Sequence, residues 1–351
     1  MVVHSKGGIV VLVTTDEGLT GIGEAGFSSE YFPTVGPIIN DQLGPMLIGQ
    51  DPRLIASLWK KMFRATHMWG RRGIETYAVS GIDIALWDLL GKISNQPVYR
   101  MLGGAKSRVR AYLAPSLKPT EEVLDEARDA VRDGYTAIKL RGTEDLASTI
   151  ELVGGVRDVV GPDFEIMLDA NMSYNRRGAL ALAKELEPLG AAWLEEPILS
   201  HSLTQYIDDH SWLADRISMP LAGGESLLTR YEYIDVLSRR TFDVLQPDCT
   251  SVGGISEAKR VADLASTWNI ECVPHIACSS GTGIALAAGL HLILGCSNAP
   301  LIEYDPYGGP GWDGMLVAPA SVQKGFIEAT EAPGLGVELA EDALERFAVA
   351  S

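Results

Sequence analysis

Acidic, basic and imidazole side chains stand at the ends of a series of short apolar runs. In chain order they are Lys139 and Arg141, Asp169 and Asn171, Glu195, Glu225, Asp248, His275 and Glu303. Any one of them alone is explained by a helix cap, a strand end or a hydrogen-bonded core histidine. Independent capping would not place four acids and a histidine at the same end of successive strands, one strand–helix unit apart. The series therefore predicts one shared active site.

Three of these groups, Asp169, Glu195 and Glu225, supply only carboxylate oxygens. Carboxylates that face one another repel unless a cation lies between them. A set of hard oxygen ligands without Cys or His selects Mg²⁺, or Mn²⁺, over Zn²⁺. We therefore expect a divalent metal site that leaves room for a substrate carboxylate and stabilises the enolate formed when the α proton leaves.

The other charged groups suit proton transfer and anion binding. Asp248 lies one strand before His275 and can hold it as a dyad, which fixes the tautomer and raises the basicity of the imidazole. Lys139 and Arg141 are two positions apart on one strand, so their side chains share a face. Their positive charges can bind a substrate carboxylate and the developing enediolate.

These groups require a scaffold that gathers the carboxyl ends of parallel strands. Between about residues 110 and 305, short apolar runs alternate with amphipathic helical segments. We predict strands over 111–114, 135–141, 164–169, 191–195, 219–223, 242–246, 271–275 and 301–304. Eight strands with seven or eight intervening helices predict an α/β fold, most simply a closed parallel barrel, whose functional groups lie at the carboxyl ends of the strands.

The two chain ends flank this barrel region. Segments 8–15 and 19–24 predict a hairpin, and 75–93 predicts an amphipathic helix. Residues 308–333 are rich in Gly and Pro. The expected parts are an α+β capping domain over 1–106, a catalytic barrel over 107–307 and a C-terminal segment over 308–351 that returns to the cap.

Composition and charge restrict the class of protein. Of the 351 residues, 46% are apolar. No run approaches the ~20 apolar residues that a membrane span needs. The first residues also do not resemble a signal peptide. The net charge of −17 argues against nucleic acid and anionic membranes as partners, so we expect a small-molecule carboxylate. The four cysteines are Cys249, Cys272, Cys278 and Cys296. They form no CxxC pair, which argues against a disulfide framework and predicts a cytoplasmic location.

Together with three further motifs, these groups resemble the mandelate racemase subgroup of the mandelate racemase/muconate lactonizing enzyme family, within the enolase superfamily. The motifs are TDEGLTGIGE at 15–24, GIDIALWD at 81–88 and PGLGV at 333–337, so the resemblance covers nearly the whole chain. Sites of this superfamily use a Lys or His base together with Mg²⁺.

The resemblance implies a modified (β/α)7β TIM-like barrel with a cap built from both chain ends. It also implies that Asp169, Glu195 and Glu225 bind Mg²⁺ and that Asp248 and His275 form the base dyad. In addition it implies that Glu303 hydrogen-bonds to the substrate carboxylate and that the chain forms a homo-oligomer, a dimer or an octamer.

One position departs from the family pattern and bears on the reaction. The family usually carries lysine at both positions of this strand motif, and the second is the base that faces the histidine; here the second is Arg141. Arginine stays charged, so it should not abstract a proton, and His275 is left as the single base. Racemisation needs an acid or base on each face of the α carbon. Dehydration can use His275 alone, first as base and then as acid for the departing β-hydroxyl.

The leading expectation is therefore a carbon–oxygen lyase that dehydrates a sugar acid to a 2-keto-3-deoxy acid. The alternative is a racemase, epimerase or lactone cycloisomerase that uses the same enolate, since Lys139 could reach the proton if Arg141 moved aside. The muconate-lactonizing subgroup is disfavoured because it usually carries a lysine after the sixth strand, where this chain has Asp248. A barrel kept only for structure or binding is disfavoured because every metal and dyad position is filled.

Two further expectations concern the cap. The family usually has a strand and a mobile loop ahead of Ser5, so we expect that the first strand and its loop are missing here. His67 and Arg71, beside Arg72, lie in a helix-poor stretch that could overhang the barrel mouth, although a solvated turn explains them equally. We name Asn171, His67 and Arg71 as candidate substrate contacts.

Overall fold

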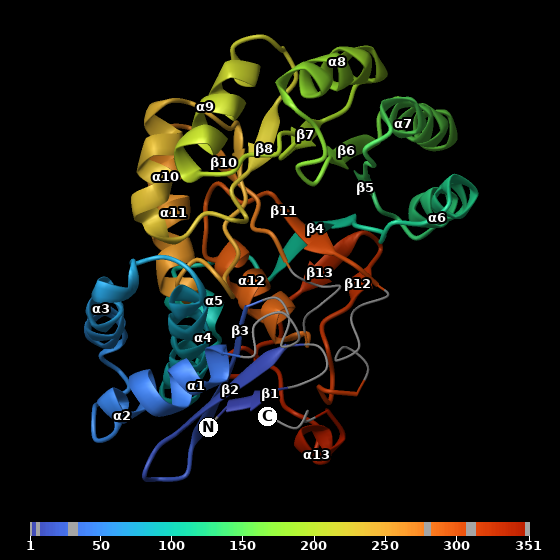
Figure 1. Cartoon of the computed structure of the whole chain (residues 1–351). Coiled ribbons are helices and arrows are strands. Elements are labelled where there is room, and N and C mark those ends of the chain that lie inside the picture. Colours follow the sequence, from blue (N-terminus) through green and yellow to red (C-terminus); the bar gives the residue numbers. More distant parts are fainter. Residues whose placement is uncertain (1, 5–7, 27–33, 277–281, 307–313, 348–351) are drawn as a thin grey trace.

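The computed structural model describes residues 2–4, 8–26, 34–276, 282–306 and 314–347. Its centre is a set of parallel strands in the spatial order β10-β9-β8-β7-β6-β5-β4-β11 (Figure 1). The strands are β4 (Arg108–Leu113), β5 (Ala137–Arg141), β6 (Glu165–Asp169), β7 (Trp193–Glu195), β8 (Leu221–Gly223), β9 (Val244–Leu245), β10 (Glu271–Cys272) and β11 (Leu301–Tyr304). Each overlaps a strand expected from the sequence.

A helix follows each of the first seven barrel strands. They are α6 (Thr120–Arg132), α7 (Leu146–Val160), α8 (Arg176–Leu186) with the short η3 (Glu187–Leu189), α9 (Leu203–Ala214), α10 (Thr229–Ser238), α11 (Gly254–Thr267) and α12 (Ile284–Leu294). The next described element after β11 belongs to the C-terminal segment. The expected (β/α)7β order is therefore confirmed.

The ring closes between its first and last strands. β11 pairs with β4 in parallel, with Leu301 opposite Arg110. On the other side, the Cys272 N–H of β10 donates to the Asn298 carbonyl just ahead of β11 at 2.9 Å. A closed ring leaves no long exposed sheet edge.

Alternation along the strands separates the barrel interior from the helix layer. Ile138, Leu140 and Leu194 belong to the large core that includes residues of the surrounding helices. A second cluster, inside the barrel, is made of Tyr112, Ala114, Ala137, Met167, Trp193, Ala222, Val244, Val273 and Leu301. Because successive side chains point to opposite faces, Lys139 and Arg141 share the inner face with Ala137.

The cap begins with a small antiparallel sheet, β1 (Val2–His4), β2 (Ile9–Thr14) and β3 (Thr20–Ala25). The expected hairpin is confirmed as β2–β3. β1 pairs antiparallel with β2, and residues 5–7 between them lie outside the described residues. That the family's first strand and mobile loop are missing ahead of Ser5 stays a prediction.

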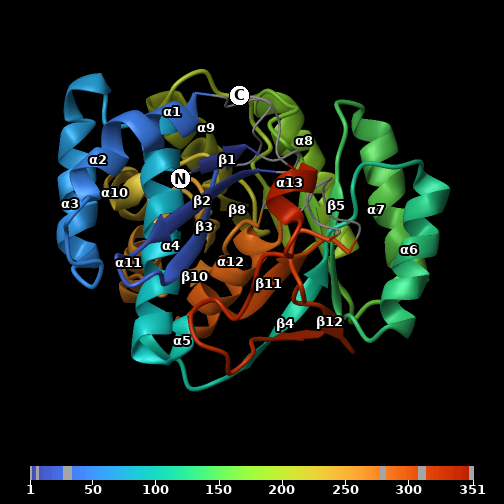
Figure 2. The same cartoon turned by 90° about the horizontal axis from the view of Figure 1, so that it is seen from below.

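The long helix α4 (Ile74–Ser94) packs against this sheet (Figure 2). Gly21 and Gly23 of β3 make the close approach possible, because a Cβ there would lie 2.1 Å from the Ala85 carbonyl and 2.2 Å from the Gly81 carbonyl. Gly21 and Gly23 of the motif at 15–24 therefore have a packing reason. The other cap helices are α1 (Val35–Pro37), the π-helix η1 (Ile38–Leu43), α2 (Gly44–Leu47), α3 (Ile55–Ala65), η2 (His67–Trp69) and α5 (Val98–Met101).

The C-terminal segment first adds to the barrel and then reaches the cap. β12 (Val322–Gln323) and β13 (Phe326–Glu328) form a hairpin, and β13 pairs antiparallel with β4. Farther on, the Leu335 N–H donates to Asp88 of α4 at 2.8 Å, and α13 (Ala343–Phe347) ends the described chain. These strands were not predicted, because two or three residues carry no readable alternation. Within the described parts, no helix is long and apolar enough to cross a membrane.

Candidate active site

Charged side chains lie at the carboxyl ends of neighbouring barrel strands. On β5, Lys139 and Arg141 follow the apolar Ala137 on the inner face, and on β6 Asp169 follows Met167. Asp169 lies opposite Arg141 in the β5–β6 register and opposite Glu195 in the β6–β7 register. The inner face thus changes from apolar to charged toward the mouth, as in other parallel barrels.

Lys139 is held between two carboxylates. Its Nζ lies 3.0 Å from Glu195 Oε1 and 3.0 Å from Glu303 Oε1, and the side chain is 1% exposed. Burial by itself would lower the pKa of Lys139, but the charges of Glu195 and Glu303 outweigh it and raise that pKa well above its ordinary value. Lys139 is therefore a fixed cation.

Arg141 pairs with the neighbouring strand. Its Nη1 lies 3.1 Å from Asp169 Oδ2, while the other oxygen of Asp169 accepts the Asn171 N–H at 2.9 Å. Burial, and then the charges of Glu195 and Glu225, raise the pKa of Asp169 to about 7 despite Lys139 and Arg141. Burial is the larger cause, and the charges of the two neighbouring carboxylates add to it.

Asp248 and His275 form the expected pair. His275 Nδ1 lies 2.8 Å from Asp248 Oδ2, and His275 Nε2 lies 3.3 Å from Glu225 Oε2. Asp248 Oδ1 accepts the Thr250 N–H and hydroxyl, both at 2.6 Å. Burial would lower the pKa of His275, but the charge of Glu225 and the bond to Asp248 raise it to about 10. With Asp248 fixing the Nδ1 proton, Nε2 is the nitrogen available for proton transfer.

Glu303 contacts both Lys139 and the backbone beside His275. One oxygen pairs with Lys139, and Oε2 accepts the Ile276 N–H, next to His275, at 3.2 Å. Burial would raise the pKa of Glu303, yet the charges of Lys139, His275 and Arg141 lower it to about 2. Glu303 is thus a permanent anion between the lysine and the histidine.

Two buried residues that the sequence did not single out support the acids. Gln246 Nε2 donates to Glu195 Oε2 at 2.7 Å, on the oxygen not used by Lys139. Glu196 Oε1 accepts the Gly224 N–H at 2.8 Å, directly before Glu225. Burial and the charge of Glu225 raise the pKa of Glu196 to about 8. The consecutive acids 195 and 196 after one strand were the only available signal for Glu196.

The three candidate substrate contacts lie at the periphery. The Asn171 side chain is exposed, and only its backbone N–H supports Asp169. His67 and Arg71 are exposed on the cap, and the bonds described for their side chains join them to each other at 2.9 Å. Arg72 reaches farther, since its guanidinium donates to Glu232 at 2.7 Å and to the Ser226 carbonyl at 3.2 Å, beside Glu225.

The donor set suits a hard divalent cation, but the carboxylates are not gathered around one point. Among the described residues no three His, Cys, Asp or Glu side chains converge in a metal-binding cluster. The oxygens of Asp169, Glu195 and Glu225 instead face Arg141, Lys139 and His275. All-oxygen donors and surplus negative charge fit Mg²⁺, and a cation would take over contacts that these basic groups make here.

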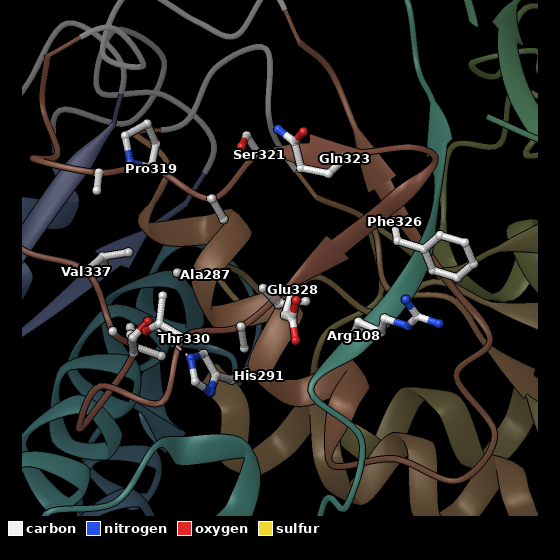
Figure 3. A pocket seen from close by; sticks show the side chains of 16 residues that line it. Arg108, Ala287, His291, Pro319, Ser321, Gln323, Phe326, Glu328, Thr330 and Val337 are labelled. Carbon is white, nitrogen blue, oxygen red and sulfur yellow. Dashed lines mark hydrogen bonds between the residues drawn. The ribbon is translucent and has the colours of Figure 1, made fainter. Parts of the chain in front are cut away.

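A separate cavity of about 410 Å³ lies between α12 and the C-terminal segment (Figure 3). Its lining includes Arg108, at the amino end of β4 and so at the opposite end of the strand from the charged cluster. His291 lines it too, but its ring nitrogens bond to the Tyr99 N–H at 3.0 Å and to the Leu335 carbonyl at 3.1 Å. This histidine is a structural one.

The chain matches two family descriptions. Residues 1–103 match "Mandelate racemase / muconate lactonizing enzyme, N-terminal domain", and residues 122–343 match "Enolase C-terminal domain-like". Together they account for most of the chain.

Curated relatives are sugar-acid enzymes of similar length. Arabinonate dehydratase of Saccharolobus solfataricus is 34% identical over 95% of this chain and 89% of its own. D-galactonate dehydratase of Verminephrobacter eiseniae is 35% identical over 94% and 88%. D-galactarolactone cycloisomerase of Agrobacterium fabrum is 31% identical over 97% and 90%.

Solved structures share the architecture. The 3,6-anhydro-D-galactonate cycloisomerase from Zobellia galactanivorans matches with a TM-score of 0.90 at 30% identity, over 99% of this chain and 97% of its own. A racemase from Streptomyces coelicolor with bound magnesium matches with a TM-score of 0.87 at 27% identity, over 97% and 91%. The sequence matches over both domains, together with this shared fold, place the chain in the mandelate racemase/muconate lactonizing enzyme family of the enolase superfamily.

Proposed function

We propose that this protein removes the proton α to the carboxylate of a sugar acid and then eliminates the β-hydroxyl, which gives a 2-keto-3-deoxy acid. The observation that carries the proposal is the pair of cations on β5: Arg141 cannot give up its proton, and Lys139 lies 3.0 Å from Glu303, a carboxylate that is not an assigned metal ligand. With Lys139 and Arg141 both held as cations, His275 is the one basic group here whose ordinary pKa, 6.5, is near neutrality. One base suits dehydration and disfavours racemisation.

Asp169, Glu195 and Glu225 are the residues we assign to Mg²⁺. The support is their all-oxygen chemistry, the excess negative charge around Asp169, and the magnesium in the racemase of the same fold. When bound, the cation supplies positive charge that stabilises the anion left by the α proton and offsets the carboxylates that raise the pKa of His275. Mn²⁺ has the same ligand preference and is a proposed substitute.

His275 acts twice in the proposed reaction. Its Nε2 takes the α proton, and the electron pair of the C–H bond moves into the carboxylate group. When that pair returns to form the double bond between the α and β carbons, the β-hydroxyl takes the proton from His275 and leaves as water. The resulting enol becomes the 2-keto acid. Asp248 keeps Nδ1 protonated through both steps.

Lys139, Arg141 and Glu303 orient the substrate carboxylate in this proposal. Lys139 and Arg141 present positive charge to it. Glu303, itself an anion, can accept a hydrogen bond from the substrate carboxyl group where that group carries a proton. Asn171, His67 and Arg71 remain proposed contacts at the rim, where they could meet the distal end of a longer acid.

A lactone cycloisomerase is the second candidate function. It is favoured by two cycloisomerases among the similar proteins. Both functions begin with removal of the α proton by His275 and differ in the group that leaves the β carbon. A racemase or epimerase is less favoured, since the face opposite His275 carries only the two fixed cations.

Three wider proposals rest on composition and family. We propose a homo-oligomer, a dimer or an octamer, because the family forms such assemblies. We propose a cytoplasmic location, because the described cysteines Cys249, Cys272 and Cys296 are free; Cys278 lies outside the described residues. We also propose that nucleic acid and anionic membranes are not partners, given the net charge of −17.

A substrate screen tests the proposed function. Purified protein with Mg²⁺ is incubated with aldonic, uronic and aldaric acids and their lactones, and 2-keto products are detected with semicarbazide. A keto acid from one of the acids is the expected result. A keto acid formed from a lactone but not from the corresponding open acid would favour the cycloisomerase, and α-proton exchange in D₂O without a keto acid from either would favour racemisation.

A further inference from the structure

Four barrel helices, α6, α10, α11 and α12, begin without a side-chain cap of their own, and in the last two the N-cap residue is a glycine. α11 starts after Gly253 and α12 after Gly283, and neither glycine can offer a side-chain acceptor to the first turn. By contrast, Asp145, Asn175 and Ser202 cap their own helices α7, α8 and α9. α11 follows β9 and Asp248 in the chain, and α12 follows β10 and His275.

The cap supplies the missing acceptors at α11. Asp83 of α4 is 0% exposed, and its Oδ2 accepts the Ser256 N–H at 2.9 Å. Ser80, one turn earlier on α4, accepts the Gly253 N–H at 2.8 Å. Gly254 has φ of +86°, and a Cβ there would lie 2.2 Å from Asp83 Oδ2. The start of α11 is therefore shaped around a carboxylate from the other domain.

The same arrangement recurs at α12. Glu24 of β3 is 0% exposed, and its Oε1 accepts the Thr282 N–H at 3.0 Å. Its Oε2 accepts the Thr282 hydroxyl at 3.0 Å and the Ala285 N–H at 2.9 Å. A carboxylate at a helix start satisfies backbone N–H groups and interacts favourably with the helix dipole.

A short chain of hydrogen bonds connects the cap to Asp248 itself. The Gly26 N–H, at the end of β3, donates to the Thr250 carbonyl at 2.9 Å. The Thr250 N–H and hydroxyl in turn donate to Asp248 Oδ1 at 2.6 Å. The orientation of Asp248 thus depends on a loop that the cap holds from outside the barrel.

We propose that the capping domain keeps the Asp248–His275 pair in its working geometry by supplying Asp83 and Glu24 as cross-domain caps to α11 and α12. Both are positioning residues, since they act through the helix starts and touch no reacting atom. The inference rests on the proposed role of His275 as base. It also gives a physical reason for Glu24 in the cap motif at 15–24 and for Asp83 in the cap motif at 81–88.

Asp88 provides a matched control. It lies on the same helix as Asp83, is also 0% exposed, and its carboxylate also accepts backbone N–H groups. Its partners, however, are Ile22 of β3 at 2.9 Å, Leu335 of the C-terminal segment at 2.8 Å and Lys92 of α4 itself at 2.7 Å, and none of them belongs to a helix that follows the dyad. A comparison of variants at Asp83 and Asp88 therefore separates the general effect of removing a buried carboxylate from the specific effect of removing its hydrogen bond to α11.

The experiment compares Asp83→Asn, Glu24→Gln and Asp88→Asn in the full chain labelled with ¹⁵N-histidine. The His275 ring signals, assigned by their absence in His275→Asn, report the bond to Asp248 whether or not a substrate is known. We expect them to shift in Asp83→Asn and Glu24→Gln and to stay in place in Asp88→Asn. With the substrate from the screen, kcat should fall about 10- to 100-fold in the first two variants with little change in KM.

Unchanged His275 signals and unchanged kcat in both variants, with a loss of thermal stability like that of Asp88→Asn, would overturn the inference. If wild-type protein turned over no substrate, the proposed function would fail while the ring signals still decided the positioning role. If Asp83→Asn did not fold, Ser80→Ala would serve instead, because it removes the acceptor of the Gly253 N–H and otherwise only a bond to the Thr76 carbonyl within α4.

Discussion

At the scale of single residues, burial and pairing determine which group can act as a base. Lys139 lies between Glu195 and Glu303 and is 1% exposed, so losing its proton would leave two buried carboxylates without a partner. His275 has Asp248 on one ring nitrogen and presents the other to Glu225. Position 141 then separates the two candidate reaction classes, because arginine cannot give up its proton.

The first prediction concerns the base. His275→Asn removes the nitrogen that takes the α proton, so turnover should fall by about 10²- to 10⁴-fold, the range typical for a lost general base. Mg²⁺ affinity, measured by calorimetry, should stay near the wild-type value because no assigned ligand changes. Normal turnover in this variant would refute the one-base scheme.

The second prediction concerns the opposite face of the substrate. Arg141→Lys restores a group that can lose a proton, so some exchange of the α proton from that face should appear. The measurement is deuterium incorporation by NMR in D₂O. Arg110→Lys, in an ion pair with Glu165 near the start of β4, is the control and should show wild-type exchange. Absence of new exchange in Arg141→Lys would count against the two-face argument.

The third prediction concerns the metal. Glu195→Gln removes a charge from the centre of the three assigned ligands, so Mg²⁺ affinity should fall by at least about tenfold. Glu151→Gln, on the exposed side of α7, should leave the affinity unchanged. Equal calorimetric affinities for the two variants would mean that the ligand set is wrong.

At the scale of elements, glycines with positive φ allow helices and strands to meet closely. Gly254 begins α11 directly against Asp83, whereas Gly154 lies inside α7 with nothing within 4 Å of the position of a Cβ. The two sites therefore differ in space and in backbone conformation, although both are helical glycines.

The fourth prediction compares alanine substitutions at Gly254 and Gly154. Gly254→Ala should lower the free energy of unfolding by about 1–3 kcal/mol, because the methyl group meets Asp83 and φ of +86° is strained for alanine. Gly154→Ala should raise it by about 0.5–1 kcal/mol, through the lower backbone entropy of the unfolded chain. Chemical denaturation measures both, and a neutral Gly254→Ala would mean that α11 can shift away from Asp83.

At the scale of the whole molecule, buried titratable groups away from the site make stability depend on pH. His210 of α9 is 0% exposed, packed against Tyr206 and Phe242, and burial lowers its pKa to about 4. The unfolded chain binds this proton at about 6.5. The neutral imidazole therefore contributes stability above pH 6.5 that is lost as the pH falls toward 4.

The fifth prediction follows from the lowered pKa of His210. His210 should make the folded protein roughly 2 kcal/mol less stable at about pH 5 than at about pH 7. His210→Gln should reduce the difference between those two pH values, as measured by denaturation at each pH. His67→Gln, at an exposed position, is the control and should leave the difference unchanged. The idea fails if both variants keep the wild-type difference.

The sequence by itself determined the features that depend on local pattern. Strand alternation, helical periodicity and turn residues predicted all eight barrel strands and the β2–β3 hairpin, since these signals are carried by neighbouring residues. The charged groups at the ends of the second to eighth strands followed from the same count, because parallel strands present their carboxyl ends together. The family motifs added the cap and the class of chemistry.

Only the tertiary structure decided which of these groups touch one another. The pairing of Lys139 with Glu303, the support of Glu195 by Gln246, and the reach of Glu24 to Ala285 join residues far apart in the chain. The same holds for His67 and Arg71, which lie against each other on the surface of the cap. Such contacts depend on the register and packing of whole elements, and a periodic pattern fixes the face of a side chain but not its partner.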